Sequence, residues 1–208
     1  MNTLLKQITA TALCLAPTLS HANEEIRPSV FFAGEVEPEG TPRAQMQNLI
    51  FDVATAWADC NADSMTAAVS DDVQFSYPTT AYAGKDKILA DLAAFCDLAT
   101  DVSFYFPADA FYIDEASGRI AAELQFRAFQ RGNRQVINDV WIATVEDGEI
   151  TIIKEYLDGR VKSLQAIGVL EYEESPEFLT PWPSRTPEWE ACFPLTSVTM
   201  ADTCPPAE

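Results

Sequence analysis

In the first half of the chain, after about residue 40, apolar residues are spaced as in helices. Apolar residues recur three and four positions apart, as in a helix with one buried face. Thr41 followed by Pro42 fits a helix N-cap and a first helical residue. The pattern predicts three helices, over 41–60, 63–69 and 84–98, and a short strand over 73–77.

After Thr100 the hydrophobic period changes from 3.6 residues to 2, which indicates strands. An extended stretch over 102–113 is interrupted near Pro107. Three longer strands follow, over 119–131, 135–145 and 149–158, with glycine-containing hairpin turns at 131–133 and 146–148. Helices followed by an antiparallel sheet predict the α+β fold class.

The alternation along the three long strands assigns their side chains to two faces of the sheet. One consistent choice gives a mostly apolar inner face of Ala122, Leu124, Phe126, Ile137, Asp139, Trp141, Ile153, Glu155 and Leu157. The outer face then carries Glu123, Gln125, Arg127, Asn138, Lys154, Tyr156 and Asp158. Such a polar face suits either an exposed sheet or a wet homodimer interface.

Two carboxylic acids, Asp139 and Glu155, thus fall on the apolar face of neighbouring strands. Burial raises a carboxyl pKa, and two nearby carboxylates titrate far apart, so the pair could serve as general base and general acid. One alternative is a structural acid that accepts hydrogen bonds from backbone N–H groups, Trp141 or a tyrosine. Another is a register that places Asp139 outside.

The two ends of the chain differ from the middle. Residues 1–22 have a basic start, a 12-residue apolar run and small residues before position 23, which is typical of a secretory signal peptide rather than of a buried helix. Cys14 lacks the small preceding residue of a lipoprotein site, so we expect a secreted or periplasmic protein without a membrane anchor. Residues 23–40 predict a loosely held arm, and 171–208 a proline-rich irregular tail.

Composition narrows the classes of function. The chain has 208 residues, enough for one domain with extensions, and a net charge of −19, which disfavours binding to nucleic acid or to an anionic membrane. The single histidine, His21, lies in the predicted signal peptide. The mature protein would then lack imidazole, which excludes Ser-His-Asp and Cys-His catalysis and metal sites ligated by histidine.

Cleavage of the signal peptide would leave four cysteines, an even number that predicts two disulfides in an oxidising compartment. Of three pairings, we favour Cys60–Cys96, on predicted helices, and Cys192–Cys204, within the tail. The alternative is four buried free thiols. We expect no metal, because no Cys-x-x-Cys occurs.

Five short motifs follow one another within residues 41–170, at 57–63, 73–78, 82–85, 145–150 and 154–158. In this order they resemble the SnoaL-like, polyketide cyclase-like branch of the nuclear transport factor 2-like superfamily. The resemblance implies a cone-shaped α+β barrel, in which three N-terminal helices pack on a strongly curved antiparallel sheet around an apolar pocket. It also implies isomerases, cyclases, epoxide hydrolases or binders without activity, since the fold alone does not choose among them.

The resemblance transfers unevenly to single residues. Members similar to limonene epoxide hydrolases have an acid at the place of Glu155, but their Arg-x-Asp partner falls on Ala122 and Leu124, which disfavours epoxide hydrolysis. Members similar to ketosteroid isomerases have an aspartate base before the proline that matches Pro78, where this chain has Tyr77. A second acid of those members has its nearest match in Asp139, on the strand of Ile137.

We therefore expect an exported protein that binds an apolar or aromatic small molecule. As an enzyme it would be an isomerase or cyclase without cofactor, shifting a proton or closing a ring α to a carbonyl. Glu155 would be the base, and Asp139 or Tyr77 the proton donor. The expected ligand-binding residues are Trp57, Tyr82, Leu124, Phe126, Trp141 and Leu157.

Two other classes of function stay open. A binding module without activity would use the same pocket, and an interaction protein would use its acidic surface or its sheet face. The aromatic residues could also have structural roles, because a tryptophan such as Trp57 on the first helix more often belongs to the core than to a ligand site. In the tail, Trp182 and Trp189 could either cover the pocket or pack against the sheet.

Overall fold

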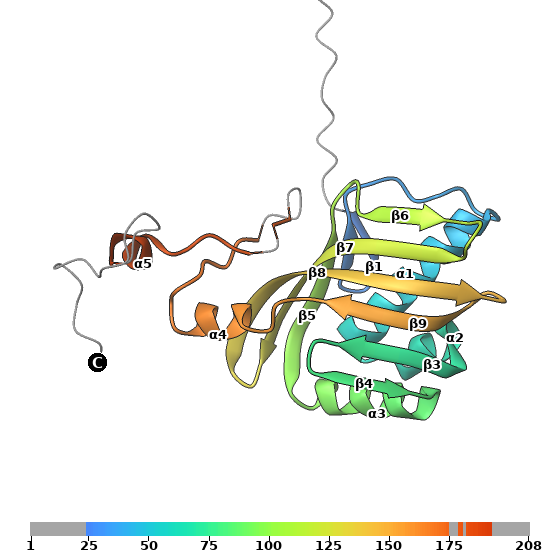
Figure 1. Ribbon diagram of the computed structural model, residues 1–208, viewed down its shortest axis with the longest axis horizontal. Helices are drawn as coiled ribbons and strands as arrows, with labels where there is room; N and C mark the ends of the chain where they lie inside the picture. The colour runs from blue at the N-terminus through green and yellow to red at the C-terminus, as the bar shows by residue number, and fades with distance from the viewer. Residues whose placement is uncertain (1–23, 175–178, 181, 193–208) are drawn as a thin grey trace, which may run out of the picture.

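The computed structural model describes residues 24–174, 179–180 and 182–192 (Figure 1). The predicted signal peptide therefore lies outside the described residues, and so does Cys204 of the predicted tail disulfide. The predicted α+β class is confirmed: three helices in the first half of the chain cover one face of a curved sheet.

The three helices begin and end close to where the apolar spacing places them. They are α1 (Pro42–Ala58), α2 (Ala62–Ala68) and α3 (Lys85–Cys96). The Thr41 hydroxyl accepts a hydrogen bond from the backbone N–H of Ala44 at 3.1 Å, which confirms it as the N-cap of α1. Asn61 caps α2 in the same way through the N–H of Ser64.

The sheet combines the predicted strands with several that the periodicity does not reveal. Its strands are β1 (Glu24–Arg27), β2 (Val30–Phe32), β3 (Val69–Tyr77), β4 (Thr80–Ala83), β5 (Ala99–Phe106), β6 (Phe111–Asp114), β7 (Arg119–Gln130), β8 (Asn133–Glu146) and β9 (Glu149–Tyr156). Their order is β1-β2-β5-β7-β8-β9-β3-β4, with β6 paired to β7. Two-residue turns join β7 to β8 and β8 to β9, as predicted.

The sheet is mixed, and in this respect the expectation of an antiparallel sheet was wrong. β2 runs parallel to β5, and β3 runs parallel to β9. Both parallel pairs join strands that are far apart in the sequence, and only neighbours joined by hairpins must be antiparallel. The long central strands β7, β8 and β9 are antiparallel as expected.

The expectation of a loosely held arm over 23–40 was also wrong. Val30 and Phe32 of β2 are fully buried, and the Phe31 ring stacks on Tyr105 of β5 with 4.6 Å between ring centroids. A strand of three residues is too short to show a period of two in the sequence. Its place is decided by the free edge of β5, which supplies the backbone partners.

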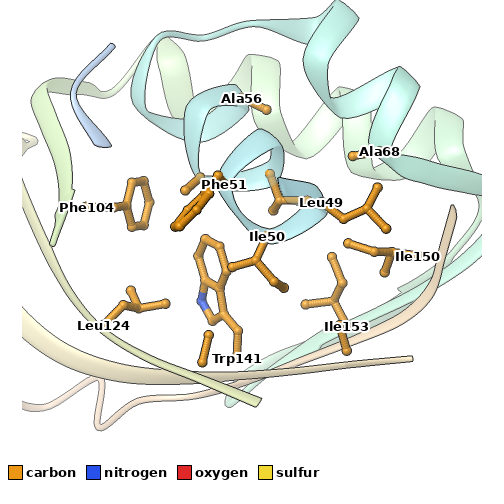
Figure 2. Close-up of a cluster of buried hydrophobic side chains, with 14 of the residues drawn as sticks. Leu49, Ile50, Phe51, Ala56, Ala68, Phe104, Leu124, Trp141, Ile150 and Ile153 are labelled. Atoms are coloured by element: carbon orange, nitrogen blue, oxygen red, sulfur yellow. The ribbon is translucent and has the colours of Figure 1, made fainter. Parts of the chain in front are cut away.

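The core lies between α1 and the concave face of the sheet (Figure 2). Ile50 and Phe51 of α1 point toward the sheet, where Leu124 of β7 and Trp141 of β8 meet them. The predicted disulfide Cys60–Cys96 is present, with 5.9 Å between the Cα atoms, and joins the turn after α1 to the end of α3. It holds α3 over the open end of the cone.

Part of the outer face of the sheet, which was expected to be exposed or to form a wet homodimer interface, is covered by the tail, while Lys154 and Tyr156 on the same face are exposed. Gln125 and Arg127 on this face are buried. The Gln125 side-chain amide donates to the backbone carbonyl of Glu173 at 2.8 Å, and the Arg127 guanidinium binds the Glu174 carboxylate at 2.9 Å. The described part of the tail thus covers this part of the outer face.

Two short helices that the sequence pattern does not reveal follow the last strand, α4 (Val161–Ala166) and α5 (Pro187–Cys192). Val161 of α4 packs with Ile137 and Leu157 in a second apolar cluster at one end of the sheet. The Gln165 side chain bonds both the N–H and the carbonyl of Val136 on β8. This segment therefore closes part of the wide end of the cone.

Candidate functional site

A cavity of about 1500 Å³ is lined by residues of α1, α3 and the strands β3, β5, β7, β8 and β9, and it extends past the end of the sheet to residues of both sheet faces. On the inner, concave side three acids share the wall with aromatic side chains. The aromatic members there are Trp57, Phe75, Tyr77, Phe95, Phe104, Phe126 and Trp141, and the acidic members are Asp91, Asp139 and Glu155, while Glu123 and Asp158 line the cavity from the outer face and the rim. Such a wall of rings with few polar groups is typical of a small-molecule site.

The register of the central strands brings the two predicted acids together. Asp139 on β8 lies opposite Leu124 on β7, and Trp141 on β8 lies opposite Glu155 on β9. Asp139 and Glu155 are therefore diagonal neighbours on one face, and the predicted inner face is confirmed for this part of the sheet. Phe75 of β3 pairs with Ile153, which places Tyr77 beside Glu155.

Asp139 is buried, with only 3% of its surface exposed. Its Oδ2 accepts a hydrogen bond from the indole N–H of Trp141 at 2.9 Å. Its Oδ1 is buried and has no hydrogen-bond partner among the described residues. A buried carboxylate oxygen without a partner is costly, so this atom is a place where a ligand or a proton would find an unmet polar group.

The pair is built to share a proton. Burial raises the pKa of Glu155 well above its usual value, and the adjacent Asp139 charge raises that pKa further. Burial also raises the pKa of Asp139, while hydrogen bonds from Glu155 and Trp141 oppose that rise. A proton on Glu155 that points to Asp139 satisfies both groups, and the raised pKa values keep this shared proton bound to a higher pH than an isolated carboxyl group in water would hold it.

Asp91 is a third acid of this wall, and the sequence analysis missed it. It lies on α3 and accepts a hydrogen bond from the Tyr82 hydroxyl at 2.9 Å. Its carboxylate also helps to raise the pKa of Glu155. The available signal was its position three residues after Ile88 and four before Phe95, because an acid within the apolar stripe of a helix must face the same side.

Four of the six predicted ligand-binding residues line the cavity, namely Trp57, Phe126, Trp141 and Leu157. Leu124 does not, because its side chain is fully buried in the core beneath the cavity. Tyr82 does not either: its ring stacks on Phe75, 5.5 Å between centroids, and its hydroxyl is tied to Asp91. Tyr82 belongs to strand β4.

Basic side chains of the lining lie on the hairpin, the outer face and the rim rather than on the interior wall. They are Arg131, Lys154, Arg160 and Lys162. Arg160 is engaged by Asp158, whose pKa it lowers to about 2. The lining continues past the end of β9 to Leu179, Thr180 and Trp182 of the tail, so part of the tail borders the opening.

Within the part of the chain that the structure describes, no group of three or more His, Cys, Asp or Glu side chains is arranged to hold a metal ion. Among the same residues, no helix has the length and apolar character needed to cross a membrane.

The comparisons with known proteins address the fold. The model of the SnoaL-like domain family matches residues 51–153. A protein with a ketosteroid isomerase-like fold from Catenulispora acidiphila, solved in complex with trimethylamine, has a TM-score of 0.52 at 15% identity, covering 62% of this chain and 97% of its own. Among curated proteins, no match to this chain was found.

Two further solved structures have the same architecture. PrhC from Penicillium brasilianum has a TM-score of 0.53 at 13% identity, over 59% of this chain and 86% of its own. An epoxide hydrolase from Mycobacterium tuberculosis, similar to limonene epoxide hydrolase, has a TM-score of 0.50 at 15% identity, over 59% and 90%. At these identities the likeness concerns the fold.

Helices packed in a cone on a curved sheet, with a cavity at the open end, define the nuclear transport factor 2-like class of protein. The match of residues 51–153 to the SnoaL-like domain and the shared fold support the SnoaL-like branch of this class.

Proposed function

We propose that the cavity is the active site of a small-molecule isomerase or cyclase that works without a cofactor. It would move a proton next to a carbonyl group of an apolar substrate. One observation carries this proposal: Asp139 and Glu155 lie side by side in an aromatic cavity, and Oδ1 of Asp139 has no partner other than the carboxyl of Glu155 among the described residues. A pair with one shared proton can accept a second proton and return it.

The proton transfer balances within the pair. Glu155, the more exposed of the two acids, accepts the proton from the substrate carbon, while its own proton passes to Oδ1 of Asp139. The electrons of the broken C–H bond form the enolate, and the Tyr77 hydroxyl beside Glu155 donates a hydrogen bond to the enolate oxygen. Return of the proton to another carbon completes an isomerisation, and attack of the enolate carbon on a second carbonyl closes a ring.

Epoxide hydrolysis is not proposed. Ala122 and Leu124, which stand where that chemistry needs an arginine and a second acid, are both fully buried in the core. Glu155 therefore has Asp139 and Trp141 as its polar neighbours, rather than an arginine that would hold a water molecule for attack.

Deuterium exchange at the α carbons of 2-tetralone tests the proposal. This ketone is apolar, bicyclic and small enough for the cavity. We expect exchange in D₂O, followed by NMR, to be faster with the protein than in buffer, and to fall about 100-fold or more in Glu155→Gln. Tyr77→Phe should lose about tenfold, because it removes one hydrogen bond to the enolate.

The matched control is Glu149→Gln, which changes an exposed acid on the same strand. It should exchange 2-tetralone at the wild-type rate. Binding without exchange, measured by the fluorescence of Trp57 and Trp141, would contradict the catalytic proposal and support a binding protein. Exchange that Glu155→Gln leaves unchanged would contradict the assignment of the base.

Export is part of the proposed function. It is supported by the signal-peptide pattern of residues 1–22 and by the Cys60–Cys96 disulfide, a bond that persists in oxidising compartments. Expression of the full chain in a bacterium, followed by mass spectrometry of the periplasmic fraction, should find a protein that begins at Asn23. A full-length product confined to the cytoplasm would contradict export.

A further inference from the structure

We propose that the cavity selects ligands that carry a positive charge, such as a protonated or quaternary amine on an apolar skeleton. The inference rests on the proposed function, because it names the class of molecule that occupies the same site. It follows from the distribution of charge on the cavity wall, which is independent of the proton transfer.

Within the described structure, the inner wall of the cavity carries acidic side chains and no basic ones. The interior wall carries Asp91, Asp139 and Glu155, and among its described residues no basic side chain points in from the same faces of α3, β3, β8 and β9. With one proton shared by the Asp139–Glu155 pair, the wall keeps negative charge on that pair and on Asp91. A charge in a confined, partly dry cavity acts more strongly than the same charge in water.

Oδ1 of Asp139 is a buried acceptor that a ligand could satisfy. Trp141 occupies Oδ2 of Asp139, and Oδ1 is left without a partner by the described residues. The proton of Glu155 can reach Oδ1, but Glu155 then keeps an oxygen that faces the cavity. An ammonium group of a ligand would supply the positive charge that this pair lacks, and an N–H group on it would supply a donor.

Aromatic rings surround the acids on the cavity wall. Trp57 and Phe75 lie 6.2 Å apart by ring centroids, Trp57 and Phe95 lie 5.3 Å apart, and Phe104 and Trp141 lie 5.3 Å apart. Aromatic faces attract a cation, most strongly when water is excluded. The combination of rings and carboxylates stabilises an alkylammonium group, which is weakly hydrated, more than it stabilises an uncharged group of the same shape.

The basic residues at the edge of the cavity do not cancel this effect. Arg160 is paired with Asp158, and Lys154 is exposed on the outer face of β9. Both lie where solvent screens them, whereas Asp139 is buried. The interior therefore stays negative relative to its rim.

The test uses two probes of equal shape and different charge. Benzyltrimethylammonium is a cation, and neopentylbenzene is its uncharged carbon isostere. Affinities are measured from the fluorescence of Trp57 and Trp141 in 0.3 M NaCl, which screens the general attraction of a chain with net charge −19. We expect the folded wild-type protein to bind the cation at least tenfold more tightly than the isostere.

Variants assign the preference to the cavity. Asp139→Asn should reduce the ratio of the two affinities to less than threefold. Asp91→Asn, at a less buried position, keeps the test decisive if the first variant does not fold, and should reduce the ratio at least twofold. Asp109→Asn, an exposed acid in the turn between β5 and β6, should keep the wild-type ratio.

Three outcomes overturn the inference. Equal or tighter binding of neopentylbenzene by the wild-type protein refutes the selection by charge, and leaves the small-molecule site of the proposed function intact. A tenfold preference that Asp139→Asn and Asp91→Asn both retain refutes its origin in the cavity. Binding of neither probe refutes the inference as well, while exchange of 2-tetralone would still report separately on the proposed function.

Discussion

The two faces of strands β7 and β8 both bury polar side chains, but they treat them differently. On the outer face, Gln125 donates to the Asn138 side chain at 2.9 Å, and Arg127 donates to Gln125 at 2.8 Å. The tail supplies the remaining partners. On the inner face, Asp139 is as deeply buried as Gln125, yet Oδ1 of Asp139 has no partner among the described residues other than the neighbouring acid.

Within this one pair of strands, the outer face has the features of a structural network and the inner face those of a functional site. A buried polar network with all its partners rigidifies a protein and contributes to its stability. A buried acid that lacks a partner costs stability, and such a cost is maintained where the group acts on a ligand. The outer network thus holds the tail in place, while the inner pair is available for chemistry.

The largest expected effect comes from the disulfide that holds the wall of the inner face. Replacing Cys60 and Cys96 by alanine removes a link across 36 positions of sequence, and should lower the free energy of unfolding by about 3–4 kcal/mol. Urea unfolding measures the loss. Because the disulfide holds α3 over the cavity, binding of benzyltrimethylammonium should weaken as well. A loss below about 1 kcal/mol would contradict this role.

Removal of a side chain from the hydrogen-bond network of Gln125, Arg127 and Glu174 on the outer face should change stability and leave ligand binding unchanged. Arg127→Ala removes the ion pair with Glu174, the bond to Gln125 and the contact of the guanidinium with the Tyr105 ring, 3.6 Å from its centroid. We expect a loss of about 2–3 kcal/mol, measured by urea unfolding. The matched control, Arg119→Ala, changes an exposed arginine on the same strand and should cost less than about 0.5 kcal/mol.

The proposed separation of the two sheet faces would be contradicted if Arg127→Ala also changed ligand binding in the cavity. Binding of benzyltrimethylammonium at a temperature where the variant is folded should match the wild-type value. A tenfold loss of affinity would show that the two faces act as one unit.

On the inner face, removal of a charge should stabilise the protein. The pKa of Glu155 is raised in the folded state, so folding binds a proton that the unfolded chain releases above about pH 4.3. The wild-type protein therefore loses stability as pH rises from there through the raised pKa, whereas Glu155→Gln should lose less, because only Asp139 of the pair then keeps a raised pKa. We expect the variant to be about 1–3 kcal/mol more stable than wild type at pH 8, with the difference vanishing below pH 4.

Thermal unfolding of both proteins between pH 4 and 9 measures this prediction. Glu149→Gln, on the same strand and exposed, should follow the wild-type curve. A destabilised Glu155→Gln at pH 8 would mean that Glu155 is an ordinary structural acid, which is the alternative that the sequence left open.

The smallest expected effect lies at the rim, between the two faces. Arg160 lowers the pKa of Asp158 to about 2, so the stabilisation is present above about pH 4 and is lost as pH falls through 2. The pair is largely solvated, and Asp158→Asn should shift the midpoint of thermal unfolding by less than about 2 °C at pH 7. A larger shift would place Asp158 in the working part of the site.

Local patterns were sufficient for most of the fold. The spacing of apolar residues located α1, α2 and α3, and strict alternation located the long strands, because in each case the side chains of one element meet a single buried face. Strands β1, β2 and β4 escaped detection, since they are short and take their place from the edges of strands distant in the sequence.

The sequence predicted those residues of the candidate site whose sheet face follows from the alternation of side chains along a strand. Alternation alone placed Asp139 and Glu155 on one face, and both line the cavity. Asp91 was missed because its distance from β9 depends on how α3 packs over the sheet. Tyr82 and Leu124 were misplaced for the same reason: parity assigns a face, whereas neighbouring elements decide whether that face is core or cavity.

By itself, then, the sequence determined the α+β class, the central strands, the inner position of both acids and the Cys60–Cys96 bond, all of which follow from periodicity and from short-range chemistry. Only the tertiary structure decided that the tail covers part of the outer face, that the sheet is mixed and that a third acid joins the pair. These features depend on contacts between segments far apart in the chain, and the free energy of such contacts is set by packing that no local pattern encodes.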